Sequence, residues 1–245
     1  MAVSARAQRE IQHGERIAAR NPELVWGWAT AAGQLRARRR AALIAKGAGL
    51  GPGVRALEVG CGSGLFTEYF AATGAEIVAV DISEDLLEHA RARHLDRRRV
   101  SFVAGRVEDL DGAGSFDAVV GSSVLHHLEI DEALRRLAQL LKPRGRLSVA
   151  EPNMLNPQIV LERRVPYLRR RLNVSPDETA FVRWSFSRTL ARHGFTNIHI
   201  EPFDWLHPLT PPPLIPAVLT FGRVLERLPG VRELAGSLWI ACSRG

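Results

Sequence analysis

A glycine-rich turn between two apolar runs constrains the fold of this 245-residue chain more than any other feature. The run Ala56–Val59 leads into Gly60-Cys61-Gly62-Ser63-Gly64, and a second apolar run further along ends at Asp81. Glycine lets the backbone turn sharply and approach a ligand because it has no Cβ. The order of strand, glycine turn, helix, strand and acid predicts a cradle for a nucleotide-type cofactor.

The spacing of the glycines distinguishes between cofactors. Dinucleotide enzymes use G-x-G-x-x-G, in which the third glycine allows close packing of the helix. Here the pattern is G-x-G-x-G, and Leu65 occupies the dinucleotide position of the third glycine. Glu58, two residues before Gly60, would repel a pyrophosphate and attract an ammonium group. The pattern therefore favours S-adenosylmethionine, which carries an α-amino group, a ribose and an adenine but no phosphate.

The stretch from Ala56 to Gly64, together with Asp81, resembles motif I and the following acidic motif of class I S-adenosylmethionine-dependent methyltransferases. The resemblance is to the quinone-biosynthesis and small-molecule branch, and it extends from about Arg36 to Asn153. It implies an α/β fold with a Rossmann-like, seven-stranded, mostly parallel sheet that carries helices on both faces. It also implies S-adenosylmethionine as the cofactor.

The remaining patterns predict the same architecture, because strands that alternate with helices form a parallel sheet. An N-terminal helical cap is expected over residues 1–50, with a break at Asn21-Pro22, and the methyltransferase domain over residues 51–245. Residues 153–182 and a C-terminal insert between strands 6 and 7, residues 203–236, are expected to form lid or substrate elements. Helix starts are expected at Ser83 and at Ser175-Pro176. Strands are predicted at 55–59, 76–80, 100–103, 116–121, 146–150, 198–201 and 238–241, and helices at 65–73, 84–94, 131–141 and 186–193.

Composition excludes several classes of protein. No apolar run approaches the roughly 18 residues of a spanning helix and the N-terminus lacks a signal-peptide core, so a cytoplasmic protein is expected. Cys61 and Cys242 are far apart and form no C-x-x-C, which argues against a zinc site and a disulfide framework. The formal net charge is +7, with arginine clusters at 36–40 and 163–171. Such clusters can bind nucleic acid or anionic lipid, or form solvated helix faces.

The resemblance implies a set of cofactor-binding residues. In quinone-biosynthesis O-methyltransferases an arginine at the position of Arg40 binds the cofactor's carboxylate, although Arg40 also belongs to a run that could be solvated. Asp81 is expected to accept hydrogen bonds from the ribose hydroxyls. The full predicted set is Arg40, Glu58, Gly60, Cys61, Gly62, Gly64, Asp81, Ile82, Arg106, Val107 and Ser122.

The adenine contact is the least determined part of this set. The segment Gly105–Leu110 resembles the family's "GDAEDL" stretch, whose first acid commonly contacts adenine. Arg106 replaces that acid here. The contact could pass to the backbone at Val107, or to Glu108 or Asp109.

His127 is the candidate general base. It belongs to Phe116–Leu128, which resembles motif IV and its "LHHL" continuation. A neutral imidazole near the sulfonium could take a proton from a hydroxyl as the methyl group transfers, but a purely structural histidine fits the sequence equally well. Some quinone-type relatives have Glu-His here and bind a divalent ion. Because His126 replaces that Glu, no metal is predicted.

Three residues outside these motifs have open roles. Glu151 follows the fifth predicted strand in an E-P-N turn, where it could orient a substrate or cap the turn. Trp26 and Trp28 suit a lid or an aromatic substrate wall, and simple packing against the sheet is the alternative.

The sequence supports three functions. The first is a methyltransferase for a small molecule, most directly the O-methylation of an apolar, aromatic or lipid-like acceptor, with peripheral contact with a membrane surface. Gly121-Ser122-Ser123-Val124 stands where amino-directed enzymes carry an N-P-P-Y turn, which argues against that route. An RNA-modifying enzyme ranks lower, because no row of stacking aromatics accompanies the arginines. The third is a silent, cofactor-binding partner protein.

Replacing Asp81 tests the cofactor assignment. We expect Asp81→Ala to weaken S-adenosylmethionine binding by about 1–3 kcal/mol, since hydrogen bonds to a charged group are lost. Calorimetry measures this directly, and an unchanged affinity would refute the assignment of Asp81 to the ribose.

Overall fold

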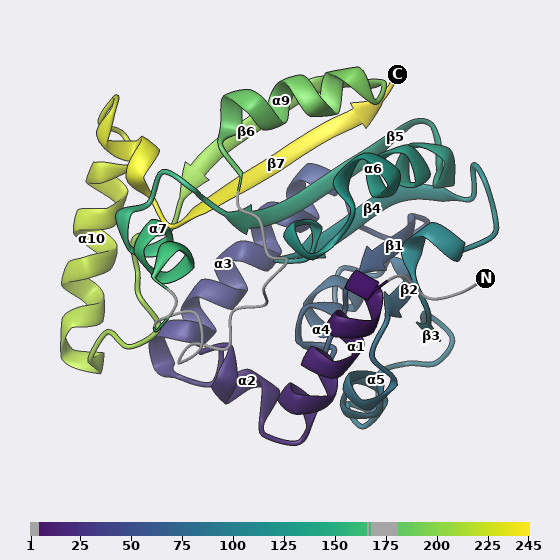
Figure 1. Cartoon of the computed structure of the whole chain (residues 1–245), viewed down its shortest axis with the longest axis horizontal. Helices are drawn as coiled ribbons and strands as arrows, with labels where there is room; N and C mark the ends of the chain where they lie inside the picture. Colours follow the sequence, from purple (N-terminus) through teal and green to yellow (C-terminus); the bar gives the residue numbers. More distant parts are fainter. Residues whose placement is uncertain (1–4, 166, 168–180) are drawn as a thin grey trace.

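A computed structural model describes residues 5–165, 167 and 181–245 of the chain (Figure 1). Its first part is helical, as predicted. Asn21 lies between the first two helices, and its side chain accepts hydrogen bonds from two backbone amides at the start of the second, which explains the predicted break. The three helices are α1 (Ala5–Ala18), α2 (Pro22–Val25) and α3 (Ala31–Ala48).

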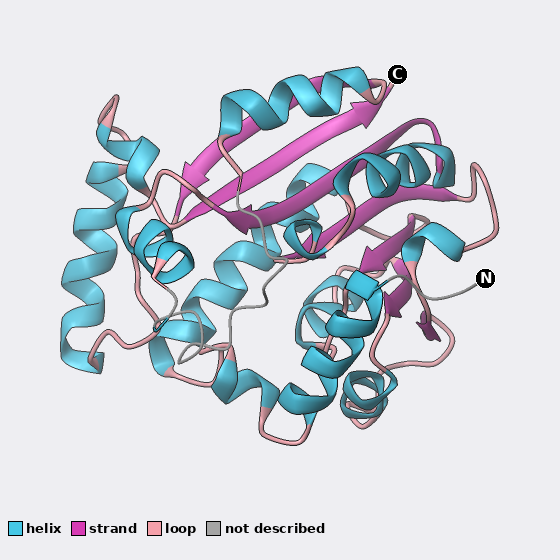
Figure 2. Ribbon diagram, in the orientation of Figure 1, coloured by secondary structure: helices cyan, strands magenta, loops and turns pink. Residues whose placement is uncertain are grey.

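Seven strands form one sheet in the order β3-β2-β1-β4-β5-β7-β6 (Figure 2). Strands β1 to β5 pair in parallel, whereas β7 is antiparallel to both β5 and β6, so the predicted fold class is confirmed. The strands are β1 (Arg55–Val59), β2 (Glu76–Asp81), β3 (Val100–Ala104), β4 (Phe116–Ser122), β5 (Leu141–Pro152), β6 (Phe195–Phe203) and β7 (Ser237–Arg244). The helices and 3₁₀ turns between them are α4 (Leu65–Ala71), α5 (Glu84–Arg91), η1 (Val107–Asp109), η2 (Leu125–His127), α6 (Ile130–Leu140), α7 (Pro157–Arg164), α9 (Arg183–Arg192), η3 (Pro212–Leu214), α10 (Ile215–Leu225) and η4 (Val231–Leu234).

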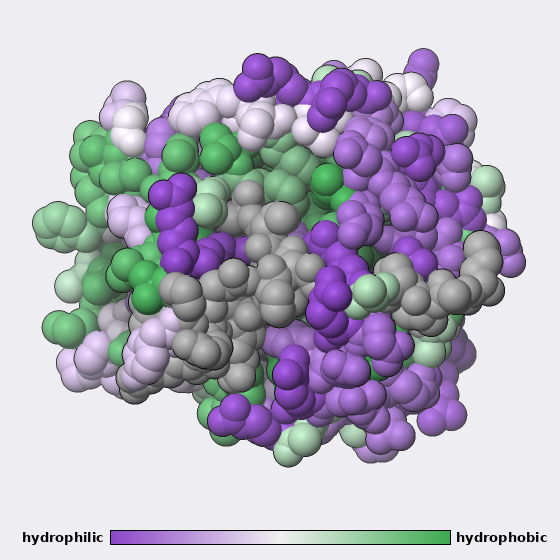
Figure 3. Space-filling model, viewed as in Figure 1, coloured by the Kyte–Doolittle hydropathy of each residue, from purple (hydrophilic) through white to green (hydrophobic). Residues whose placement is uncertain are grey.

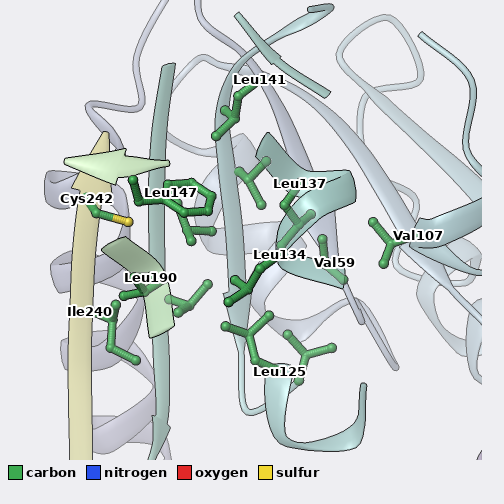
Figure 4. Packing of buried hydrophobic residues seen from close by; sticks show 14 of the residues in the cluster. Val59, Val107, Leu125, Leu134, Leu137, Leu141, Leu147, Leu190, Ile240 and Cys242 are labelled. Carbon is green, nitrogen blue, oxygen red and sulfur yellow. The ribbon is translucent and has the colours of Figure 1, made fainter. Parts of the chain in front are cut away.

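Helices cover both faces of the sheet, and each face has its own apolar core. On one face α6 and α9 bury leucines against β4, β5 and β7 (Figure 4). On the other face α3 packs against β4, β5 and β7, whereas α4 packs against β2 and α5 against β2 and β3. Because both faces of the central strands are buried, those strands are apolar runs rather than alternating ones. Ser83 caps α5 by accepting a hydrogen bond from the Leu86 amide, as predicted.

Strands β5, β6 and β7 are each several residues longer than the sequence predicts. β5 begins at Leu141, since Leu141 pairs with Phe116 before the register shifts and Arg146 pairs with Ala118. Residues 142–145, which the predictions left between a helix and a strand, thus form a bulge inside the strand, with Arg144 in the left-handed region at φ 63°. β6 extends from Phe195 because antiparallel pairing with β7 continues along its whole length.

The insert between β6 and β7 is tied to α3 by ion pairs. Arg36 Nε lies 2.8 Å from the Asp204 carboxylate, and Arg39 donates two hydrogen bonds to Glu226 at 2.8 and 2.6 Å. Such bidentate pairs have a fixed geometry. These two members of the arginine cluster at 36–40 therefore hold the insert in place and do not form a solvated face.

The described residues also bear on the compositional predictions. Cys61 and Cys242 are buried free thiols. Within residues 5–165, 167 and 181–245, no helix has the length and apolar character needed to cross a membrane. The helix start predicted at Ser175-Pro176 and the arginines at 169–171 lie outside the described residues.

Candidate active site

A cavity of about 480 Å³ lies at the carboxyl ends of the parallel strands, where this class of sheet binds its ligands. Its volume falls in the range of roughly 300–1,000 Å³ that is typical of small-molecule sites. The turns after β1, β2, β3 and β4 line it, together with α1 and the segment before α3. The predicted site residues that it brings together are Gly60, Cys61, Gly62, Asp81, Ile82, Arg106, Val107, Ser122 and His127.

The glycines of the turn have two different roles. Gly62 has φ 52°, and a Cβ there would lie 3.0 Å from the ring of Trp26 on the facing wall. Gly64 has φ 77°, and a Cβ there would lie 2.9 Å from the Cβ of Ala90 in α5. Gly62 therefore keeps the cavity open, whereas Gly64 does not line it and allows two helices to pack closely.

Asp81 connects the glycine turn to the end of β2. Its Oδ2 accepts a hydrogen bond from the Gly62 amide at 2.8 Å, and its Oδ1 accepts one from the Ser83 amide at 2.9 Å. Burial raises the pKa of Asp81, while these two amides oppose the rise. Asp81 lines the cavity, so its remaining acceptor capacity faces a ligand. Its predicted role on the ribose stays a prediction.

Glu58 lies beneath the turn and does not line the cavity. It is 1% exposed, and its Oε2 has no hydrogen-bond partner among the described residues. Burial raises the pKa of this carboxyl to about 8, and the neighbouring Asp81 charge adds to the rise while the Thr67 hydroxyl opposes it. The direct attraction expected between Glu58 and an ammonium group is therefore not supported by its position.

Arg40 is also placed behind the cavity wall. It is 3% exposed, so its interpretation as a solvated residue is wrong. Its guanidinium donates to the hydroxyl of Ser123 at 3.0 Å, to the carbonyl of Ala150 at 3.1 Å and to the hydroxyl of Ser237. Burial lowers its pKa to about 10. These bonds join the ends of β4, β5 and β7, and the predicted contact with a cofactor carboxylate gains no support from them.

Not all of the residues after β3 that were predicted to contact adenine line the cavity. Arg106, Val107 and Glu108 line the cavity, whereas Asp109 does not. Arg106 Nε lies 3.5 Å from the Glu108 carboxylate, and burial raises the pKa of Glu108. A partly desolvated carboxyl beside the cavity suits an amino group of a ligand better than Asp109 does.

His126 and His127 have separate environments. His126 is buried, and its Nδ1 lies 2.6 Å from Glu151 Oε2. The other oxygen of Glu151 accepts hydrogen bonds from the amides of Val124 and Leu125 at 3.0 and 2.8 Å. Burial would raise the pKa of Glu151, but His126 and these amides outweigh it and hold the pKa below its usual range. Glu151 therefore caps the η2 turn rather than its own E-P-N turn, and it does not line the cavity, whereas η2 presents His127 to the cavity.

Helix α1 supplies a wall that sequence reasoning missed. The residues that it contributes recur at helical spacing, a signal present in the sequence. They were not assigned because nothing local shows which surface an amphipathic helix will cover. These residues are Arg6, Ala7, Glu10, His13, Gly14 and Ile17.

Trp26 and Trp28 both line the cavity. Trp28 also packs edge-on against Phe66, with 5.5 Å between ring centroids, and Arg36 lies over its ring. The two tryptophans therefore combine the wall and packing roles that the sequence left open. Within the described part of the chain, no group of three or more His, Cys, Asp or Glu side chains is arranged to hold a metal ion.

The cavity residues fit S-adenosylmethionine in chemical character. Ser63 is buried in the wall, and its hydroxyl has no hydrogen-bond partner among the described residues, so a polar ligand would satisfy it. Asp81 and Glu108 add carboxylates that attract a ligand bearing an ammonium and a sulfonium. Asp81 could hold the ribose, and Glu108 or the backbone at Val107 the adenine.

Known proteins resemble this chain in sequence and in fold. A model of the methyltransferase domain family matches residues 57–147. An S-adenosylmethionine-dependent methyltransferase from Mesorhizobium loti covers 84% of this chain and 98% of its own, at a TM-score of 0.61 and 23% identity. A possible histamine N-methyltransferase from Thermotoga maritima covers 96% of this chain and 99% of its own, at a TM-score of 0.65 and 18% identity. The [4+2]-cyclase SpnF covers 95% of this chain and 95% of its own, at a TM-score of 0.63 and 22% identity. The chain thus has the fold of the class I S-adenosylmethionine-dependent methyltransferases, and residues 57–147 match the methyltransferase domain family, in agreement with the predicted resemblance.

The matched curated relatives are enzymes of ubiquinone biosynthesis. The ubiquinone biosynthesis O-methyltransferase of Xanthomonas axonopodis pv. citri (strain 306) is 41% identical over 105 residues, which are 41% of this chain and 44% of that protein. The protein of the same name from Xanthomonas campestris pv. campestris (strain B100) is 41% identical over 106 residues. The chain spans less than half the length of the curated relatives it matches.

The buried carboxyl of Glu58 predicts a pH dependence of stability. Its pKa of about 8 in the folded chain lies above the ordinary carboxyl value of 4.5, so the folded state binds an extra proton between these pH values. Folding should therefore lose up to about 1.4 kcal/mol per pH unit as pH rises through this window. Glu58→Gln should remove that loss.

Urea unfolding of the ligand-free protein between pH 5 and pH 8 measures the difference. The gap between the stability of Glu58→Gln and that of wild type should widen with pH. Parallel stability curves would contradict a neutral Glu58 in the folded state.

Proposed function

We propose that the protein transfers a methyl group from S-adenosylmethionine to an oxygen of a small apolar, aromatic or lipid-like acceptor. The observation that carries the proposal is that one cavity joins Asp81 and the glycine turn to His127. The charge of His127 also lowers the pKa of Asp81, so the two groups are close enough to interact. A cofactor cradle and a candidate base therefore share one enclosed site.

The bound cofactor supplies an electrophilic methyl group on a sulfonium. The task of the chain is to align an acceptor oxygen with it, and such alignment accounts for much of the rate of a two-reactant step. His127 would take the proton of the acceptor hydroxyl as its oxygen forms the new bond. Trp26, Trp28 and Phe66 line the cavity and keep water from competing with the acceptor.

The walls of the cavity support an apolar acceptor. Apolar side chains come from the N-terminal segment, from α4 and from α5. We infer that residues 1–50 act as a cap on the domain formed by residues 51–245, and that 153–182 and 203–236 contribute substrate elements. The apolar wall residues include Ile17, Val25, Trp26, Trp28, Leu65, Phe66 and Leu86.

The surface of the insert supports contact with an anionic membrane. Phe221 and Val224 are exposed and three residues apart, so they lie on one side of α10, and the exposed Leu214 and Leu228 stand just before and after the helix. Figure 3 shows hydrophobic side chains gathered over this part of the molecule, at the left of the view. The exposed Arg223 and Arg227 lie on the same segment. An apolar stripe with arginines beside it is suited to an interface of anionic lipid, and it would bring the protein to a lipid-like acceptor.

RNA modification remains the second candidate, but the structure reduces its basis. Arg36 and Arg39 pair with carboxylates and Arg40 is buried, so much of the first arginine cluster is unavailable to phosphates. The expected signature of RNA binding is an affinity that falls steeply with salt.

A labelled-methyl transfer tests the proposed reaction. The protein is incubated with S-adenosylmethionine that carries an isotopic methyl group and with a cell extract, and the products are separated by fraction. Label in the organic fraction is the expected result. Label in nucleic acid would favour the RNA candidate, and no label despite cofactor binding shown by calorimetry would favour a silent, cofactor-binding protein.

Vesicle binding tests the proposed surface. We expect wild type to bind vesicles rich in phosphatidylglycerol, and Phe221→Ser with Val224→Ser to weaken that binding at least about tenfold, a loss of about 1.4 kcal/mol, because exposed apolar area is removed. Leu24→Ser with Leu35→Ser is the matched control, since both leucines are exposed and lie on other helices. Sedimentation measures the bound fraction. Equal binding by the two double variants would rule out the α10 surface.

A further inference from the structure

Helix α1 holds the backbone of the turn that carries His127. Arg6 Nε donates a hydrogen bond to the carbonyl oxygen of His127 at 2.8 Å, and Arg6 Nη2 donates one to the carbonyl of His126 at 3.2 Å. Its third nitrogen lies 3.4 Å from the Glu129 carboxylate, just beyond the turn. Since Glu151 caps the same turn from the end of β5, η2 is fixed from both sides.

The same helix brings a carboxylate to the imidazole itself. Glu10 Oε2 lies 3.0 Å from His127 Nδ1, and the side chain of Glu10 is only 11% exposed. Arg6 and Glu10 are four residues apart and therefore lie on one face of α1. A carboxylate with little access to water stabilises a nearby imidazolium more strongly than an exposed one does.

We propose that Glu10 is a positioning residue, which holds the Nδ1 side of His127 so that Nε2 is the atom that receives the acceptor's proton. This inference rests on the proposed function. The acceptor oxygen bonds to the methyl carbon, the methyl–sulfur bond breaks with its electron pair going to sulfur, and the acceptor's proton goes to Nε2. Glu10 then balances the charge of the imidazolium, as the third group does in base-assisted enzymes.

Other titratable groups also lie near His127. The ring of His126 lies 4.2 Å from that of His127, and its Nδ1 is paired with Glu151. His13, also on α1, has its ring 6.3 Å away. The other charged side chains that line the cavity are Arg6, Asp81, Arg106, Glu108, Glu129, Glu162 and Arg163. Glu10 is the carboxylate at ion-pair distance from the His127 ring in the described residues.

The test compares Glu10→Gln with Glu15→Gln. Both variants make the same substitution on α1, but Glu15 is exposed on its outer side. The first measurement is an NMR titration of the histidine rings in the ligand-free protein, with the His127 signal identified by its loss in His127→Gln. The second is the pH profile of methyl transfer, with S-adenosylmethionine affinity measured by calorimetry.

We expect the midpoint of the His127 titration to fall by about one pH unit in Glu10→Gln, a tenfold loss of proton affinity, and to stay unchanged in Glu15→Gln. The acid limb of the pH profile of methyl transfer should also move to lower pH. The plateau rate should fall because the base is weaker. Cofactor affinity should not change in Glu15→Gln.

The two measurements separate the inference from the function on which it rests. If no acceptor is methylated but the titration shifts, the contact is real and the proposed reaction is wrong. If methyl transfer occurs and Glu10→Gln behaves like Glu15→Gln in the titration and in the pH profile, Glu10 has no positioning role and the inference is overturned.

Discussion

Two carboxylates buried at the ends of strands shape the whole site. A buried carboxylate is costly unless donors satisfy it, and the nearest donors are amides of the loops that follow the strands. Asp81 takes the amides of Gly62 and Ser83, which joins the glycine turn to the start of α5. Glu151 takes two amides of the η2 turn and the His126 ring. The glycine turn and the η2 turn, which these two carboxylates hold, both line the cavity.

Several charged side chains of this protein act inside the fold. The net charge of +7 suggests a basic surface, yet Arg40 is buried among strand ends and Arg36 and Arg39 bind the insert. The cavity, by contrast, contains several carboxylates. A site that attracts a cationic ligand can therefore exist in a basic protein, because short-range pairing and burial set the local field.

The glycine spacing, Asp81 and the alternation of strands and helices predicted the fold class and most of the cofactor side of the cavity. The fold class is confirmed, and Asp81 and much of the glycine turn line the cavity, because both depend on local geometry, which a turn and its two neighbours determine. Arg40 and Glu58 were predicted to bind the cofactor, but neither residue lines the cavity. A residue's position along a helix or strand does not show whether its head reaches the ligand or a neighbouring strand.

The sequence by itself determined that a nucleotide-type cradle follows the first strand and that a histidine follows the fourth, since both are tied to strand ends. Only the tertiary structure decided that Glu10 of α1 meets His127, and that Glu151 caps the η2 turn. Glu10 and His127 are 117 positions apart in the sequence, and Val124 and Glu151 are 27 positions apart. Their physical reason is packing: α1 covers the cavity because its apolar face needs a partner, and that placement brings its charged residues to the base.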